Sequence, residues 1–521
     1  MTRWLAMVSL LLSALLIAPA RGQDECGTAA SLVYPVDTAA FRLVQDFGAP
    51  SPRHQGRYHT GEDWAPPRDD VYGVGQPVRA AASGRVTYSA PLGWGRDGGV
   101  VIIQHTFADG SVVYTQYGHL VESEAARFPV PYTCVRQGDV IGAVGSARPA
   151  PHLHFEVRVS GPDIPGPGYT WENPLAAGFR HPARLIQNWQ TWMQPYTLWR
   201  VELPAGLDLP PAELADHSLV YASGGRAVRI TPDGRALWRL ALERPLAAAL
   251  TRGGLPLLLY TDGRAQQVNL DGSLGERWDT GAALAGPPLI VSADLLVFPT
   301  ADGGLAAFGP DLRTPLWTAA VGLTPPLRAA GSSRLLAFIG ADGAMLTLAH
   351  TGGVLDTARL REPGSLAAAP DGALLVYTVG GLWTLDADGR WALREVGAPP
   401  GGAHSAALAA GDGRLFLFDG AALRAYSRDG LPLWTTELRI DPPSAAGAAA
   451  LAHYDRLLLL TTAAGDIAAV RAADGSVCGQ ARVYGGGAPL WASLGADGVL
   501  RLAADDHILA LNWSRFTAPC G

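Results

Sequence analysis

Two histidines lie one residue apart in the stretch PHLHFEVR, at His152 and His154. The apolar residues around them favour a β-strand, on which alternate side chains project from the same face. Upstream, His59 and Asp63 stand four residues apart, with a glycine between them that lets the backbone turn. His119 follows another strand-like run. These residue types bind metal ions and carry protons, so their spacing raises the hypothesis of a metal-dependent catalytic site.

Three of these residues form a set that suits a catalytic metal. Two histidines and one carboxylate, His59, Asp63 and His154, are typical ligands of catalytic zinc, whose fourth position is left for water or substrate. His119 and His152 then remain as unligated histidines beside the metal. Their ordinary pKa of about 6.5 lets such residues exchange protons near neutral pH. The pattern therefore predicts a hydrolytic zinc site.

The order and spacing of these motifs resemble the lysostaphin-like, LytM-type (beta-lytic) zinc endopeptidases, which cut peptidoglycan cross-bridges and stem peptides. The resemblance covers roughly residues 30–180, and its motifs are HTGED from His59, GQPVRAAASGRV from Gly75, YGHL from Tyr117, GDVIGAVG from Gly138 and HLHFE from His152. It implies a small antiparallel sheet carrying His59, Asp63 and His154 as zinc ligands. It also implies that His119 and His152 handle the water and steady the oxyanion, and which does which stays open.

The chain departs from the commonest family pattern beside the aspartate, where it has Glu62 and Trp64 instead of small or apolar residues. This departure leaves substrate preference open. Glu62 and Glu156 are expected to point to the opposite face of their strands from the ligands, which leaves them a supporting role at best. His105 ends an apolar run and is predicted to make a structural hydrogen bond. His54 lies in a polar stretch that is typical of a loop at the lip of a groove.

Residues 1–20 are typical of a secretory signal peptide. Arg3 precedes an apolar run that ends at Ile17, and small residues follow up to Ala20, near which we expect cleavage. No later stretch is long and apolar enough to predict a membrane span. We therefore expect an exported protein that is extracellular, associated with the cell wall or periplasmic.

Cysteine count and charge narrow the function classes further. An even number of cysteines in an exported protein favours disulfides, and one bridge per domain, Cys26 with Cys134 and Cys478 with Cys520, is the simplest pairing. The formal net charge of -7 and the lack of basic clusters argue against nucleic acid or anionic membranes as partners.

From about residue 197 a unit of roughly 40 residues recurs, which in a β-rich sequence predicts a propeller. Each unit contains apolar strands separated by glycine or Asp-Gly turns, which suit tight hairpins. Eight copies begin near Leu219, Leu257, Leu295, Leu335, Leu374, Leu415, Leu457 and Val499. Tryptophans predicted to pack between blades recur in the outer strands, at Trp238, Trp278, Trp317, Trp391 and Trp434. The histidines of this half are expected at the surface or in loops: His217, His350, His404, His453 and His507.

Residues 197–203 look like an orphaned outer strand with its own tryptophan, Trp199. We predict that this segment completes the last blade and so hides free strand edges. Eight blades are predicted, with seven as the alternative. This half resembles the PQQ-type repeat propellers, which include quinone-dependent dehydrogenases and assembly scaffolds, so the repeat indicates fold rather than function. The sequence lacks a compact acidic cluster suited to calcium and a quinone, which disfavours the oxidoreductase alternative.

The sequence as a whole predicts an all-β protein with two domains. The expected segments are a signal peptide over 1–20, a zinc endopeptidase domain over 21–180, a connector with a short helix over 181–196, and a propeller over 197–521. The predicted function is hydrolysis of peptidoglycan peptides with Zn²⁺ as cofactor, while the propeller binds a partner or the wall. The alternative is a non-catalytic peptidoglycan-binding adaptor or regulator, whose signature would be a missing ligand.

Overall fold

The computed structural model describes residues 26–66, 73–107, 111–159, 164–175, 177–192, 194–203, 205–324, 327–360, 364–369, 373–378, 381–385, 391–394, 407–427, 429–440, 449–483 and 491–520. The predicted signal peptide and His404 lie outside them. The described residues form two compact units. The first contains those up to residue 49 together with those between 59 and 169, and the second contains 50–58 together with those from 170 onward. No helix in the described part of the chain combines the length and apolar character needed to cross a membrane.

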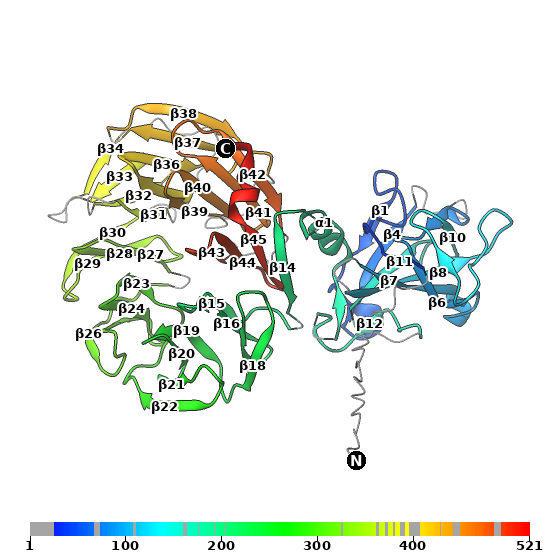
Figure 1. Cartoon of the computed structure of the whole chain (residues 1–521), viewed down its shortest axis with the longest axis horizontal. Helices are drawn as coiled ribbons and strands as arrows, with labels where there is room; N and C mark the ends of the chain where they lie inside the picture. Colours follow the sequence, from blue (N-terminus) through cyan, green and yellow to red (C-terminus); the bar gives the residue numbers. More distant parts are fainter. Residues whose placement is uncertain are drawn as a thin grey trace, which may run out of the picture. The chain divides into compact units, whose positions relative to one another are not determined.

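The first unit is built on an antiparallel sheet (Figure 1). Its main strands, in spatial order, are β1 (Arg42–Gln45), β4 (Gly61–Ala65), β11 (Leu153–Arg158), β8 (Val112–Val121), β7 (Gly99–Thr106), β6 (Gly84–Ala90) and β9 (Cys134–Val135). β10 (Val140–Val144) pairs with β8 and with β5 (Pro77–Arg79). Shorter elements before residue 181 are β2 (Pro50–Ser51), η1 (Pro52–His54), β3 (Arg57–His59), η3 (Gly95–Asp97), β12 (Tyr169–Thr170) and β13 (Phe179–Arg180).

The central strands of this sheet are rich in β-branched residues, which suit a pleated, buried surface. In β7, Val101 and Ile103 are fully buried, and in β11 so are Phe155 and Val157. Because both faces of β11 are buried, its polar side chains are held in an environment of low dielectric. The sheet thus provides a rigid base for the buried histidines that lie against it.

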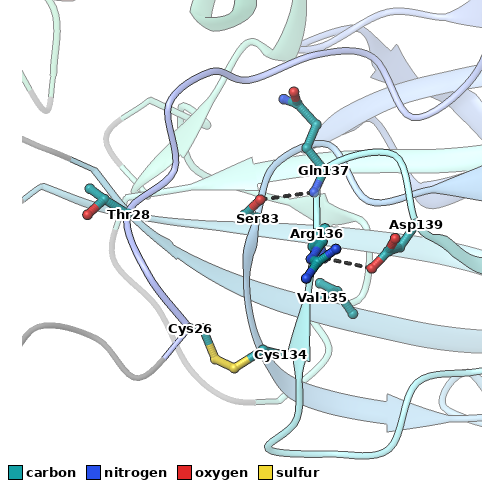
Figure 2. Close-up of a pocket in the computed structure, with 8 residues that line it drawn as sticks. All are labelled: Cys26, Thr28, Ser83, Cys134, Val135, Arg136, Gln137 and Asp139. Atoms are coloured by element: carbon teal, nitrogen blue, oxygen red, sulfur yellow. Dashed lines mark hydrogen bonds between the residues drawn. A yellow bond between two sulfur atoms is a disulfide. The ribbon is translucent and has the colours of Figure 1, made fainter.

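A disulfide joins Cys26 to Cys134 in this unit, as predicted. Figure 2 shows the open pocket beside it, where the backbone N–H of Gln137 donates to Ser83 Oγ at 3.0 Å. None of the five histidines and carboxylates predicted for the catalytic site lines this pocket. We therefore assign the bridge to anchoring the N-terminal segment against β9.

The described part of the second unit contains eight four-stranded sheets. Seven are formed by consecutive strands: β15 (Leu209–Glu213), β16 (Leu219–Ser223), β17 (Arg226–Ile230), β18 (Ala236–Ala241); β19 (Leu246–Arg252), β20 (Leu255–Tyr260), β21 (Arg264–Val268), β22 (Leu274–Asp279); β23 (Leu289–Ser292), β24 (Leu295–Pro299), β25 (Leu305–Phe308), β26 (Pro315–Ala319); β27 (Arg328–Gly331), β28 (Leu335–Ile339), β29 (Ala344–Ala349), β30 (Val354–Arg359); β31 (Ser365–Ala368), β32 (Leu374–Thr378), β33 (Gly381–Leu385), β34 (Trp391–Arg394); β35 (Ala407–Gly411), β36 (Arg414–Phe418), β37 (Ala422–Ser427), β38 (Pro432–Glu437); β39 (Ala449–Tyr454), β40 (Leu457–Thr462), β41 (Asp466–Arg471), β42 (Val477–Arg482).

The eighth sheet combines the two ends of this unit. Its strands are β14 (Thr197–Glu202), β45 (His507–Asn512), β44 (Val499–Ala503) and β43 (Trp491–Leu494), in that order. β14 pairs antiparallel with β45, with Trp199 opposite Ala510. Figure 1 shows the eight sheets around a ring, with β14 beside β45. The prediction of eight blades, closed by the segment that precedes the repeat, is confirmed.

Outer-strand tryptophans pack against glycine turns of the following sheet. A Cβ added at Gly234 would lie 2.9 Å from the ring of Trp199, and one added at Gly272 would lie 2.8 Å from Trp238. Both glycines have positive φ, so the turn and the packing each favour glycine. Gly352 with Trp317, and Gly475 with Trp434, repeat this arrangement. The predicted packing between blades is confirmed at these positions, whereas the side chain of Trp391 lies outside the described residues.

The helix α1 (Pro182–Trp192) forms within the expected connector and contacts β14 of the last blade and β42 of the neighbouring blade. The guanidinium of Arg200 lies 4.2 Å from the ring centroid of Trp192, whose ring in turn contacts His507 at 5.4 Å between centroids. His507 is only 1% exposed, so the prediction that it lies at the surface or in a loop is wrong. The reason is tertiary, because the ring of Trp192 packs against His507 and β14 pairs with the strand that carries it.

The C-terminal segment is fixed by the second predicted disulfide, between Cys478 and Cys520. It contains α2 (Trp513–Phe516) and η4 (Ala518–Cys520). Asn512 caps α2 by accepting a hydrogen bond from the backbone N–H of Arg515 at 2.9 Å. The bridge therefore ties the end of the chain to the outer strand of the neighbouring blade.

Candidate metal and catalytic site

His154 and Asp63 are direct partners in the first sheet. β11 pairs antiparallel with β4 so that His154 lies opposite Asp63, and directly opposed side chains project from the same face. His154 Nδ1 is 3.0 Å from Asp63 Oδ1. His59, at the end of β3, places its Nε2 atom 3.2 Å from Asp63 Oδ1 and 3.0 Å from His154 Nδ1. The structure thus brings the three predicted ligands together, and all three are buried.

The three donor atoms fit a single metal ion. Tetrahedral zinc with bonds of about 2.0 to 2.1 Å places its ligand atoms about 3.3 Å apart, close to the separations seen here. The second nitrogen of each ring faces an oxygen: His59 Nδ1 lies 3.2 Å from the carbonyl oxygen of Asp46, and His154 Nε2 lies 3.3 Å from Glu156 Oε2. Such contacts fix the ring tautomers and leave the inward nitrogens free to bind a metal.

The electrostatics of this cluster also suit a cation. Burial raises the pKa of Asp63, but hydrogen bonds and charges from His154 and His59 outweigh it and hold the pKa well below the ordinary value. Burial lowers the pKa of His154, but its hydrogen bonds to Asp63 and Glu156 outweigh this and raise the pKa to about 9. Without a metal, a proton on His154 therefore supplies the positive charge that the carboxylates favour. A bound metal would replace that proton.

Glu156 lies on the same face of β11 as His154, so the expectation that it points away from the ligands is wrong. Residues two apart on a strand share a face, and Glu156 Oε2 contacts His154 Nε2. Glu62 does lie on the other face, because it is the neighbour of Asp63 in β4 and side chains alternate between the two faces of a strand. It accepts a hydrogen bond from Trp64 Nε1 at 3.0 Å.

His119 reaches the site through an irregularity in β8. Gly118 is the direct partner of His154, so regular alternation would turn the next side chain, that of His119, to the other face. The backbone of His119 instead has φ of 60°, in the left-handed region, and the pairing of β8 with β7 shifts register nearby. The ring of His119 consequently lies 4.6 Å from that of His152, between centroids.

Backbone carbonyls set the tautomers of these two histidines. His119 Nδ1 donates to the carbonyl oxygen of Asp97 at 2.6 Å, and His152 Nδ1 donates to that of Ala150 at 2.9 Å. His152 Nε2 lies 3.5 Å from Asp63 Oδ2, next to the predicted ligands. Burial, and then the charge of His152, lower the pKa of His119 to about 4. The ring of His119 is therefore neutral at neutral pH and able to accept a proton at Nε2.

Trp94 forms a wall of the site that the sequence analysis missed. Its ring lies 4.9 Å from that of His119 and 5.3 Å from that of His154, and its Nε1 donates to the carbonyl oxygen of Gly166 at 2.8 Å. A Cβ on Gly118 would come within 2.1 Å of the indole, which explains the glycine of the YGHL motif. Trp94 lies in the β6–β7 connection, where local sequence carries no sign of this packing.

The other histidines of the first half have separate roles. His105 is fully buried and contacts the carbonyl oxygen of Ser83 at 3.0 Å and Thr115 Oγ1 at 2.7 Å, so its predicted structural role is confirmed. His54 is exposed, and its Nδ1 lies 2.9 Å from Ser51 Oγ.

Comparison with known families agrees with this geometry. Residues 57–165 match the model of peptidase family M23. This part of the chain is therefore similar to the peptidases of family M23. It contains all five side chains described above, from His59 to His154. Residues 342–512 match a second model, described as outer membrane protein assembly factor BamB, and fall within the propeller.

Solved structures similar to the chain include three proteins. BamB from Moraxella catarrhalis is 17% identical with a TM-score of 0.44, covering 60% of this chain and 98% of that one. The computationally designed Ika8 protein is 14% identical with a TM-score of 0.44, covering 61% and 99%. Sqt1 from Saccharomyces cerevisiae is 12% identical with a TM-score of 0.46, covering 61% and 98%. A comparison with curated proteins finds no match.

Proposed function

We propose that this protein is an exported zinc metalloendopeptidase that hydrolyses peptide bonds in the cross-bridges or stem peptides of peptidoglycan. The observation that carries the proposal is the convergence of His59, Asp63 and His154, whose donor atoms lie within 3.2 Å of one another. Two further histidines lie beside them with Nδ1 held by a carbonyl. Both disulfides favour an oxidising compartment outside the cytoplasm.

His59, Asp63 and His154 would hold the zinc, which when bound polarises the scissile carbonyl and lowers the pKa of a water molecule. His119 and His152 each present Nε2 to the site, because their Nδ1 atoms donate to backbone carbonyls. One of them accepts the proton of the attacking water and passes it to the leaving amine. The other would donate a hydrogen bond to the developing oxyanion from Nε2–H, which requires that this ring carries a second proton, because its Nδ1 is already protonated.

The remaining parts of the proposal concern the rest of the chain. We propose a signal peptide over 1–20, the peptidase domain over 21–180, the connector over 181–196 and the propeller over 197–521. The propeller is proposed to bind a partner protein or the wall. Its closed ring supports this role, because the eight blades form a stable frame whose connecting loops are available for binding.

Digestion of purified cell walls tests the proposal. The zinc-loaded protein should release muropeptides with new amino termini, which mass spectrometry identifies together with the bond cleaved. The His152→Ala variant, loaded with zinc to the same level, should release none. If the wild-type protein binds zinc and walls but releases no peptide, the adaptor alternative replaces the enzyme.

A further inference from the structure

The carboxylate of Glu156 lies directly behind the metal site and is completely buried. One of its oxygens, Oε2, faces His154 Nε2 at 3.3 Å and accepts a hydrogen bond from Thr60 Oγ1 at 2.5 Å. The other oxygen, Oε1, pairs with Arg158 Nε. Both oxygens of the carboxylate therefore have polar partners, and one of these partners is the ring of His154, which carries a predicted ligand atom.

An imidazole ring binds a metal through one nitrogen, and the hydrogen bond made by the other decides which nitrogen that is. Because a carboxylate only accepts hydrogen bonds, the contact with Glu156 favours the proton on His154 Nε2. The lone pair of His154 then lies on Nδ1, the atom that faces Asp63 and His59. We propose that Glu156 is a positioning residue, which fixes the tautomer and ring orientation of His154 for metal binding. This inference rests on the proposed function.

Arg158 explains how a buried carboxylate is kept in this position. Arg158 is 4% exposed, and its guanidinium donates from Nη2 to Gln116 Oε1 at 2.5 Å, in addition to the pair with Glu156. Gln116 Oε1 also accepts the backbone N–H of Gly166 at 3.0 Å. The carbonyl oxygen of Gly166 accepts the hydrogen bond from Trp94 Nε1. A continuous set of hydrogen bonds thus runs from the ring of His154 to the wall of the site.

A purely structural role is the competing explanation, in which Glu156 merely neutralises Arg158. Removing one partner of a buried ion pair destabilises a protein whether or not the pair has a further task. Stability alone therefore does not separate the two explanations. Metal affinity and the ligand field of the bound metal do, because they respond to the orientation of His154.

The experiment uses the full chain, stripped of metal and titrated with Zn²⁺ against a chromophoric chelator. Glu156→Gln should weaken zinc binding about 10- to 100-fold, the usual effect of losing a partner that orients a ligand. Its Co²⁺ derivative should show a shifted visible absorption band. Glu62→Gln is the matched control, because Glu62 is also fully buried and adjacent to a ligand but lies on the opposite face of its strand. It should keep the wild-type affinity and spectrum.

Thr60→Val provides a milder variant if Glu156→Gln fails to fold. It removes one hydrogen-bond donor to Glu156 Oε2 and leaves the Glu156–Arg158 pair intact, so zinc affinity should fall by a smaller factor. The positioning role would be overturned if the folded Glu156→Gln variant had wild-type zinc affinity and an unchanged Co²⁺ spectrum. If Glu156→Gln does not fold, the same result in Thr60→Val would overturn it. Failure of the wild-type protein to bind zinc would instead overturn the proposed function.

Discussion

His154 lies directly opposite Asp63 across the pair of strands β11 and β4, with Nδ1 and Oδ1 3.0 Å apart. A slip of one residue in this register would turn His154 to the opposite face of the sheet. The buried residues of β11 on both faces oppose such a slip, because it would exchange their environments. Sheet register is therefore as much a part of the site as the side chains themselves.

The metal prediction concerns the three converging residues. Purified protein should carry about one zinc per chain, and His154→Ala or Asp63→Ala should reduce this to a trace, because two remaining ligands hold zinc weakly. Elemental analysis by mass spectrometry measures the content. His54→Ala, which alters an exposed histidine outside the cluster, serves as the control. Full zinc content in the Asp63 variant would contradict the assignment of that ligand.

The proton-transfer prediction concerns the two histidines beside the ligands. His119→Ala and His152→Ala should each keep zinc and lose about 10²- to 10⁴-fold in kcat, the range expected when a general acid or base is removed. Initial rates on a cross-bridge peptide, with zinc content measured in parallel, separate a loss of proton transfer from a loss of metal. Normal hydrolysis by either variant would show that its histidine has no such role.

Because Trp94 packs against Gly118, we expect substitutions of these two residues to have coupled effects on stability. Gly118→Ala should lower activity and stability, because the new Cβ would come within 2.1 Å of the indole. Combining it with Trp94→Ala removes the clash, so the double variant should lose less stability than the sum of the two single variants. Thermal unfolding of the four proteins gives the comparison. Strictly additive losses would mean that the two residues do not interact.

The second disulfide should stabilise the propeller. The Cys478→Ala/Cys520→Ala variant should lose about 2 to 4 kcal/mol of unfolding free energy, because the unfolded chain gains conformational freedom. Denaturant titration followed by tryptophan fluorescence measures the loss. The corresponding Cys26→Ala/Cys134→Ala variant is the control and should leave the unfolding transition of the propeller unchanged.

Ring closure by β14 predicts the behaviour of two truncated proteins. A propeller beginning at residue 181 keeps α1 and β14 and should unfold cooperatively, whereas one beginning at residue 205 exposes the edge of β45 and should melt lower or aggregate. Trp199→Ala in the longer protein should fall between them. Its cost should be below the about 3 to 5 kcal/mol typical of a fully buried aromatic, because Trp199 is only half-buried. Equal melting temperatures would refute closure by this strand.

Several features were already determined by local sequence. His152 and His154 are separated by the two-residue period of a strand, which suffices to place both rings toward one side. Asp-Gly turns and apolar strands recur at a regular interval, which predicts a propeller of eight blades with seven as the alternative, and the pairing of β14 with β45 decides for eight. Two cysteines in each half leave one simple pairing, and the structure has that pairing. In each case the signal lies in spacing along the chain.

Only the tertiary structure decided how these parts meet. The left-handed backbone of His119 turns its ring toward His152, against the regular alternation of side chains along a strand. Trp94 and Gly118 depend on each other through a contact between separate segments. The sequence analysis assigned Glu156 to the wrong face of its strand, although its two-residue spacing from His154 is compatible with the same face. The burial of His507 follows from contact with a helix far away in the chain. Register, bulges and packing arise from long-range pairing, whose energy depends on partners that no local pattern specifies.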